Sequence, residues 1–174
     1  KYVKKGVKIV GCESSCIMAI RDEYPDLLKG NQMAKEVSQN TFLIQQIISS
    51  TAGDGLQQIK WTKRKLDIML HVHCHERALL GTEAALNTLN YPAGYEAKLI
   101  DAGCCGMAGS FGFEKEHYDI SMTIGEDRLF PAIRSAAQDV VVAVTGVSCK
   151  QQVEDGTSRK AKYFSEVLSD ALED

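Results

Sequence analysis

The sequence predicts an α/β fold with a mostly parallel sheet, and three observations support this prediction. Short β-branched or apolar runs alternate along the chain with longer stretches of helical periodicity. The run Asp139–Gly146 is nearly all apolar, which is typical of a strand buried on both faces of a parallel sheet. Each of four expected strands ends in a cysteine or is followed closely by one. Together these patterns predict a three-layer, Rossmann-like domain with cysteines at the carboxyl ends of its strands.

The composition is that of an ordinary globular protein. The chain has 174 residues, of which 44% are hydrophobic and 25% charged, and this length is enough for one domain with a sizeable core. No apolar run is long enough to span a membrane. The net charge of -3 gives no electrostatic support for nucleic-acid binding. Six cysteines without a recognisable secretory signal predict a reducing compartment, so we expect a cytoplasmic protein whose thiols bind metal or react.

The first expected strand, Val7–Cys12, leads through a turn into a helix that carries Cys16 near its start. Backbone N–H groups at a helix start stabilise a thiolate, which is the form that a metal binds. Cys12, at the end of the strand, fits a core position as well as it fits a metal site. The stretch Met33–Ser50 has approximate helical spacing, and we expect a covering helix that stops at a turn around Gly53.

The second expected strand is Leu66–Cys74, followed by a helix over His75–Leu89. In an extended segment, side chains two residues apart share one face. This spacing places three histidines on the same face, namely His71, His73 and His75. They could bind zinc together, or they could donate hydrogen bonds to sulfur ligands and to the backbone. Both interpretations stay open at the level of the sequence.

The third expected strand, Ala97–Asp101, leads into a glycine-rich loop. The stretch Phe113–Ala136 then has helix-like spacing, with interruptions expected at Gly125 and Pro131. After the fourth strand, Cys149 precedes another helical start, and a short amphipathic helix is expected over residues 164–172. The order of elements is thus strand and helix in alternation, as in a parallel sheet with crossover helices.

Adjacent cysteines, Cys104 and Cys105, lie in the glycine-rich loop DAGCCGMAGSFG, in which Gly103, Gly106 and Gly109 recur every third residue. Glycine allows positive φ and a close approach of the backbone to a bound group. A disulfide between neighbours closes a strained small ring and adds little stability. Zinc sites usually separate a ligand pair by about two to four residues. A cluster of several irons suits adjacent thiols better, although two packed thiols in a turn remain the alternative.

Cysteines from distant parts of the sequence are expected to meet, because the carboxyl ends of parallel strands lie at one edge of a sheet. The sequence therefore predicts a metal site at this edge. Its candidate ligands are Cys12 or Cys16, Cys74, Cys104, Cys105 and Cys149.

Two segments share a pattern of buried strand, glycine, Ser-Cys and helix: VKIVGCESSCIMAIRDE near the start and VVVAVTGVSCKQQVEDG near the end. We therefore expect one cysteine-rich domain over residues 1–174. Within it, residues 1–60 would be the tail of a preceding repeat and residues 61–174 a complete repeat. The chain begins with Lys1 rather than Met, so we expect a processed chain or a fragment of a larger protein.

Four segments resemble the motifs of the cysteine-rich CCG domain. They are ESSC (13–16), HVHCHERALLGTE (71–83), DAGCCGMAGSFGFEKEHYDISMTIGEDRLFPAI (101–133) and TGVSCKQQVEDGT (145–157). This domain occurs in one of the subunits of heterodisulfide reductase and in iron–sulfur subunits of glycolate and lactate oxidation systems. The chain is more similar to the C-terminal part of FAD-linked oxidases of the glycolate, D-lactate or 2-hydroxyglutarate dehydrogenase type. It departs from the reductase domains by lacking a closing CxxC, and Ser14 stands where the family often has proline.

The resemblance implies a 4Fe–4S cluster held by Cys74, Cys104, Cys105 and Cys149, with Cys16 as a fifth thiolate. The glycines of the loop, together with His73 and His75, would bind the cofactor from outside the ligand shell. The expected function is an electron-transfer module that passes electrons from flavin to a quinone or another carrier, and the chain is not expected to be active alone. FAD and a ferredoxin-like segment would belong to the same parent protein or complex, and such partners could hold the chain at the periphery of the inner membrane.

Two other functions remain alternatives. A structural zinc domain would use Cys74, Cys104, Cys149 and a histidine such as His73. Thiol–disulfide or heterodisulfide chemistry would instead take place at the adjacent cysteines.

Overall fold

A four-stranded parallel sheet is the centre of the computed structural model, which describes residues 1–51 and 56–173. The strand order is β4-β3-β5-β6, and all three pairings are parallel. The strands are β3 (Leu66–His71), β4 (Tyr95–Leu99), β5 (Val141–Val144) and β6 (Ala161–Tyr163). The apolar run around β5 is paired on both sides, which confirms its prediction as an interior strand.

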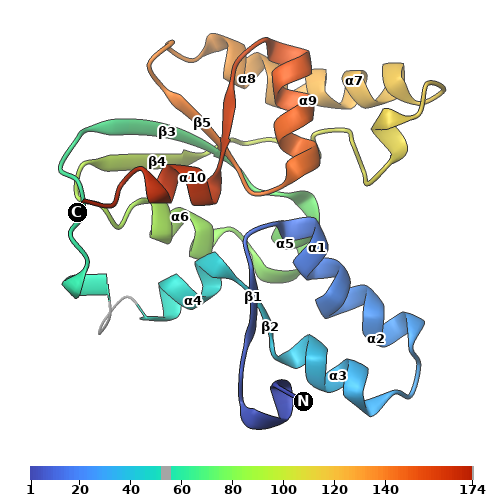
Figure 1. Cartoon of the computed structure of the whole chain (residues 1–174). Coiled ribbons are helices and arrows are strands. Elements are labelled where there is room, and N and C mark those ends of the chain that lie inside the picture. Colours follow the sequence, from blue (N-terminus) through green and yellow to red (C-terminus); the bar gives the residue numbers. More distant parts are fainter. Residues whose placement is uncertain (52–55, 174) are drawn as a thin grey trace.

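Helices cover both faces of this sheet, so the predicted three-layer α/β fold is confirmed (Figure 1). Leu70 of β3 and Ala143 of β5 pack on one face against α6 and α10, whereas Val142 and Val144 of β5 pack on the other face against α8 and α9. Helix α7 packs beside α8 and α9. The bounds are α6 (Glu83–Leu89), α7 (Tyr118–Asp127), α8 (Leu129–Ser135), α9 (Val147–Thr157) and α10 (Phe164–Ser169).

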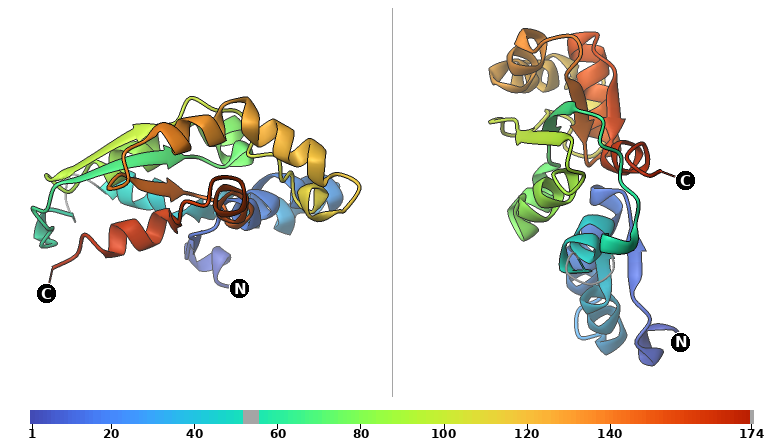
Figure 2. Two further views of the ribbon diagram at one scale, coloured as in Figure 1. Left: turned by 90° about the horizontal axis from the view of Figure 1, so that it is seen from above. Right: turned by 90° about the vertical axis from the view of Figure 1, so that its left-hand side faces the viewer.

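Residues 1–51 form a smaller lobe beside the sheet (Figures 1 and 2). Its two strands, β1 (Ile9–Gly11) and β2 (Thr41–Leu43), pair in parallel as a separate two-stranded sheet. Its helices are α1 (Ser14–Met18), α2 (Tyr24–Leu27), α3 (Gln32–Gln39) and α4 (Ile44–Thr51), and a π-helical segment (Ala19–Glu23) joins α1 to α2. The predicted first strand is thus correct in place, although shorter than expected.

The predicted single helix over Met33–Ser50 is wrong. Strand β2 separates α3 from α4, because β1 offers a partner and Ile9 N–H donates to Asn40 O at 2.8 Å just before β2 begins. Because the apolar residues on either side have helical spacing, the sequence did not predict this short strand. The turn expected around Gly53 lies outside the described residues.

Two other stretches predicted as helical each form two separate helices. The helix expected over His75–Leu89 is two helices, α5 (Cys74–Leu80) and α6, separated at Gly81 with φ of +78°. The stretch Phe113–Ala136 breaks at Arg128 rather than at Gly125 or Pro131. Pro131 lies in the first turn of α8, where no intrahelical N–H bond is lost.

Several boundaries and one strand differ from the sequence prediction. Strand β3 ends at His71 rather than at Cys74, and α10 ends at Ser169 rather than at Leu172. Strand β6 was not predicted, because three residues are too few to show an alternating pattern.

Candidate metal centre

Three neighbouring strands end at one edge of the four-stranded sheet, and cysteines follow each of them. Cys74 begins α5 after β3, the loop after β4 carries Cys104 and Cys105, and Cys149 lies in the first turn of α9 after β5. Parallel pairing brings these strand ends side by side, as expected for a ligand site in an open α/β sheet. We call these four residues the four-cysteine cluster.

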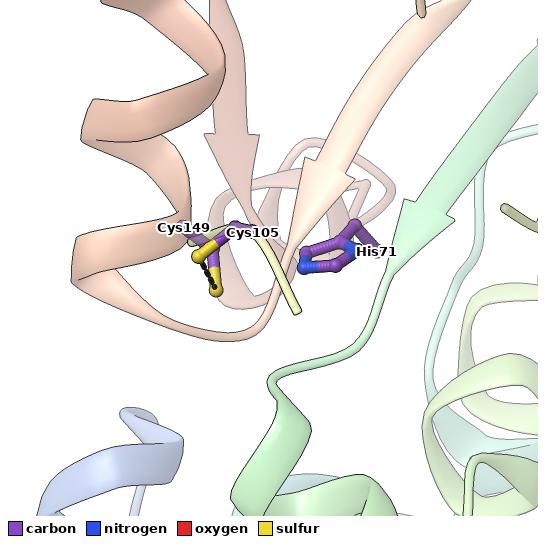
Figure 3. A group of neighbouring side chains, drawn as sticks. All are labelled: His71, Cys105 and Cys149. Atoms are coloured by element: carbon purple, nitrogen blue, oxygen red, sulfur yellow. Dashed lines mark hydrogen bonds between the residues drawn. The ribbon is translucent and has the colours of Figure 1, made fainter. Parts of the chain in front are cut away.

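The sulfur atoms of the four-cysteine cluster form one connected chain. The Sγ atoms of Cys105 and Cys149 are 3.5 Å apart (Figure 3), and both residues are buried. The Cys104 side chain interacts by hydrogen bonds with both Cys74 and Cys105. The structure therefore joins all four cysteines that the resemblance implied as ligands.

Interactions among these thiols shift their pKa values in opposite directions. The hydrogen bond from Cys105 lowers the pKa of Cys104 to about 2, with the further help of Cys74. Interaction with Cys105 lowers the pKa of Cys149 against the opposing effect of burial, and interaction with His71 lowers it further. The pKa values of Cys74 and Cys105 are raised, first because each interacts with Cys104. Cys104 and Cys149 are thus the members of the cluster that favour the thiolate form, which is the form that a metal binds.

The other two cysteines, Cys12 and Cys16, are exposed on the N-terminal lobe. The hydrogen bond between the Cys16 thiol and the Glu13 carboxylate raises the pKa of Cys16, contrary to the low pKa expected at a helix start. None of the hydrogen bonds found in residues 1–51 and 56–173 joins either sulfur to the four-cysteine cluster. The predicted role of Cys16 as a fifth thiolate therefore stays a prediction.

Of the three histidines, His71 lies within β3 whereas His73 and His75 follow its end, so they do not share the face of one strand. His73 caps α5, and its Nδ1 accepts a hydrogen bond from the backbone N–H of His75 at 3.3 Å. The His75 imidazole lies 3.2 Å from Asp22 of the N-terminal lobe. The role of these histidines, in zinc binding or in hydrogen bonding, stays a prediction.

His71 is the histidine that the structure adds to the site. Its side chain is 1% exposed, and its ligand nitrogen lies within 4.8 Å of the sulfur atoms of Cys105 and Cys149 (Figure 3). The sequence placed this residue in a row of three histidines but did not select it as a ligand. Its position at the end of an expected buried strand is the feature of the sequence that could have indicated a role at the site.

The glycines of the loop have different structural roles. Gly106 has φ of +103°, its backbone N–H donates to the Cys104 sulfur at 3.3 Å, and an added Cβ would overlap the Ser121 carbonyl oxygen. Gly109 also has positive φ, at +69°, whereas Gly103 does not. Glycine is thus required at Gly106 both for conformation and for space.

A cleft of about 700 Å³ lies beside the cluster. It is lined by residues of the N-terminal lobe, α5, the glycine-rich loop and α9, among them Ser15, His73, Cys74, His75, Gly109 and Val147. Cys74 is half-buried and connects this cleft with the buried sulfur atoms. The candidate site therefore has an open side.

Comparison with known proteins gives relatives of two kinds. One of the subunits of the anaerobic glycerol-3-phosphate dehydrogenase of Escherichia coli K12 is 32% identical over 168 residues, covering 97% of this chain and 41% of that protein. The D-2-hydroxyglutarate dehydrogenases of Haemophilus influenzae and Pantoea ananatis are 26% and 28% identical, covering 88% of this chain and 15% and 14% of those proteins. No protein-family model and no solved structure matches the chain.

The chain is homologous to part of these dehydrogenase proteins. This relationship confirms the resemblance to dehydrogenase proteins that the cysteine motifs indicated. The chain spans less than half of the length of each relative named here. Among the described residues, no helix is long and apolar enough to cross a membrane.

Proposed function

We propose that this chain is the iron–sulfur electron-transfer module of a larger flavin-linked dehydrogenase. The observation that carries the proposal is the convergence of four sulfur donors from three strand ends. The homology to dehydrogenase proteins supports a redox role for these donors.

The donor set fits a 4Fe–4S cluster. Cysteine thiolates are the usual ligands of such clusters, and Cys74, Cys104, Cys105 and Cys149 would supply four. Adjacent side chains leave the backbone in different directions, which suits two different irons. The bound cluster would accept and release single electrons. The chain would adjust its reduction potential through burial and through the backbone N–H of Gly106 at the Cys104 sulfur.

Other predicted site residues would act from outside this ligand set. His73, His75 and Gly109 line the cleft, where they would contact whatever approaches the half-buried Cys74. Gly103 belongs to the loop that holds the adjacent cysteines. We retain Cys16 as a fifth thiolate within this proposal, because Ser15 beside it lines the same cleft. We also propose that residues 1–60 are the tail of one repeat and residues 61–174 a complete one.

The substrate would be oxidised elsewhere in the parent protein or complex. The two kinds of relative are named for glycerol 3-phosphate and D-2-hydroxyglutarate, which are both small anionic compounds that bear a hydroxyl group. We therefore propose a flavin domain that oxidises such a compound, a ferredoxin-like segment, and electron transfer through this chain to a quinone or another carrier. This proposal widens the expected 2-hydroxy acid to small hydroxylated anions.

A structural zinc site is the second candidate function. It is favoured by the close grouping of His71, Cys105 and Cys149, whose ligand atoms all lie within 4.8 Å of one another. Two sulfurs and an imidazole nitrogen are ordinary ligands of a single zinc ion. This candidate differs from the one expected from the sequence, which used Cys74, Cys104, Cys149 and a histidine such as His73.

Metal and sulfide analysis distinguishes the two candidates. The chain would be purified without oxygen, and its iron, sulfide and zinc contents and visible spectrum measured. Stoichiometric iron and sulfide with broad visible absorption are expected, and Cys104→Ser combined with Cys105→Ser should abolish both. Cys12→Ser is the matched control, because Cys12 is exposed and outside the four-cysteine cluster. Zinc alone, retained after reconstitution with iron and sulfide, would contradict the electron-transfer proposal.

A further inference from the structure

The N-terminal lobe repeats the structure of the last part of the four-stranded sheet. Strands β1 and β5 each pair in parallel with the next strand along the chain, which is β2 in one case and β6 in the other. Cys16 is the third residue of α1, and Cys149 is the third residue of α9. The same number of residues separates each cysteine from the end of its strand. The pattern that the two segments share in sequence is therefore also shared in structure.

The second strand of each pair extends this correspondence. Strand β2 runs directly into α4, and β6 runs directly into α10. Gly11, the last residue of β1, lies opposite the last residue of β2, and Val144 of β5 lies opposite the last residue of β6 in the same way. By this register, Val10 of β1 corresponds to Ala143 of β5.

The two strands differ at their other edge. Strand β5 pairs there with β3, and Ala143 lies opposite Leu70 with both side chains fully buried. Strand β1 pairs only with β2 among the residues that the structure describes, and Val10 is 43% exposed. Figure 1 shows β1 and β2 in the N-terminal lobe, apart from the four-stranded sheet. Since a sheet of two strands is at most marginally stable by itself, the outer edge of β1 is a position for a further strand.

The backbone of β1 presents a hydrogen-bond donor at this outer edge. Ile9 N–H donates to the carbonyl oxygen of the residue that precedes β2. Successive N–H groups of a strand point to opposite edges, so the N–H of Val10 points away from β2. In the four-stranded sheet the corresponding edge is paired, because Thr145 N–H, two residues beyond Ala143, donates to the carbonyl oxygen of His71 in β3. Val10 N–H therefore points to the place that β3 occupies beside β5.

We propose that the outer edge of β1 pairs in parallel with a strand of the preceding repeat, from the part of the parent protein that lies before residue 1. This inference rests on the proposed division into two repeats and adds the surface at which they join. The added strand would have an apolar residue opposite Val10, as β3 has Leu70 opposite Ala143. The relatives have enough further chain for such a repeat, since this chain spans 41% of the glycerol-3-phosphate dehydrogenase subunit.

The pairing would also support the cleft beside the four-cysteine cluster. Ser15 and Glu23 of the N-terminal lobe line this cleft opposite the half-buried Cys74. Because α1 follows β1 directly after a short turn, a strand that fixes β1 also fixes this wall of the cleft. The preceding repeat would thus hold one side of the opening through which the cluster is reached.

Hydrogen exchange of single backbone amides tests the pairing. It would be measured by mass spectrometry on the full-length parent protein and on this chain alone. We expect the Val10 amide to exchange at least about tenfold more slowly in the parent protein, because a paired amide exchanges only when its strand opens. The Ala143 amide is the internal control, since β5 is paired on both sides and should be protected equally in both proteins.

Two proline substitutions separate the two edges of β1. Val10→Pro removes the N–H at the outer edge, where an edge strand tolerates proline. Ile9→Pro is the matched variant, because it removes the N–H that donates toward β2. Val10→Pro should leave the Tm of this chain close to that of the wild type and lower the Tm of the parent protein, whereas Ile9→Pro should lower both.

The outcomes separate this inference from the electron-transfer function. Equally fast exchange of the Val10 amide in both proteins would overturn the pairing. Protection of this amide in the chain alone would overturn it as well, since another partner, such as a second copy of the chain, would then close the edge. Iron and sulfide contents of the parent protein test the electron-transfer function independently of this edge. If Val10→Pro fails to fold, the exchange of the wild-type amide still decides.

Discussion

Ser14 is completely buried, and its polar groups connect the two parts of the molecule. Its Oγ lies 2.6 Å from a carboxylate oxygen of Glu76 and 2.8 Å from the Thr145 carbonyl oxygen, and its backbone N–H also donates to that carbonyl. Glu76 in turn accepts a hydrogen bond from Gln45 at 2.6 Å. The serine that replaces the proline of related turns thus makes bonds that proline could not make.

We expect Ser14→Ala to lower the free energy of unfolding by about 1–3 kcal/mol, because it leaves buried acceptors with fewer donors. Denaturant unfolding followed by circular dichroism would measure the change. Ser15→Ala is the control, since Ser15 is exposed and should change stability by less than about 1 kcal/mol. Equal effects of the two substitutions would contradict the buried connection.

Glu13 holds the turn that precedes α1 and reaches across to α9. Its carboxylate accepts hydrogen bonds from Cys16 N–H and Ser15 Oγ, both at 2.7 Å, and from Val147 N–H at 3.1 Å. Burial acts to raise the pKa of Glu13, but these hydrogen bonds outweigh it, and the pKa lies below 4.5. The stability that this carboxylate contributes is therefore present above pH 4.5 and lost as the pH falls through the lowered pKa.

Glu13→Gln should lower the free energy of unfolding by about 1 kcal/mol at pH 7, a value kept small because the half-buried carboxylate is screened by solvent. The difference from the wild type should narrow as the pH falls below 4.5. Denaturant unfolding at a series of pH values would test this, with the exposed Glu116→Gln as control. A difference that is the same at every pH would show that the charge of Glu13 is unimportant.

At the scale of elements, the loop between β4 and α7 depends on one glycine. Gly106 combines a positive φ with contact against the Ser121 carbonyl, whereas Gly103 has neither feature. We expect Gly106→Ala to lower the free energy of unfolding by at least about 1–3 kcal/mol, the usual cost of such backbone strain. It should also lower the iron bound per chain, because the strain displaces Cys104 and Cys105.

Gly103→Ala is the matched control for this loop. The atom nearest to its added methyl group would be a guanidinium nitrogen of Arg128 at 4.0 Å, an ordinary contact with a flexible side chain. Its stability and iron content should stay close to those of the wild type. Equal losses of stability and iron in both variants would mean that the loop tolerates a side chain at neither position. The requirement for glycine would then not be specific to Gly106.

The sequence predicted those elements in which the burial of each residue determines the order of apolar and polar residues. Strand β5 is paired on both sides and lies inside the sheet. Its run of valines therefore predicted a buried strand. Strand β2 has three residues and a single paired neighbour. The helical periodicity of the residues around it therefore led to the prediction of one continuous helix. The break at Gly81 depends on a positive φ, and a helix-period pattern on both sides gives no sign of it.

At the scale of the whole molecule, the order of the strands determines which cysteines lie close together. Cysteines at the ends of β3, β4 and β5 could be predicted to meet, because parallel strands share a carboxyl edge. The position of His71 beside Cys105 and Cys149 could not be predicted, since it depends on where β3 ends and on which face that residue points to. Cys16 follows β1, but β1 belongs to a separate sheet, so the edge argument did not apply to it.

Metal should therefore stabilise the whole chain, because its ligands come from three separate strand ends. Binding at about 100–1,000 times the dissociation constant stabilises a protein by about 2.7–4.1 kcal/mol, which corresponds to a rise in Tm of about 5–15 °C at this chain length. We expect chelator-treated wild type to melt that much below the loaded protein in anaerobic circular dichroism. Cys104→Ser combined with Cys105→Ser should melt at the same temperature before and after treatment. An unchanged Tm for the wild type would contradict this expectation and would mean that bound metal does not stabilise the chain.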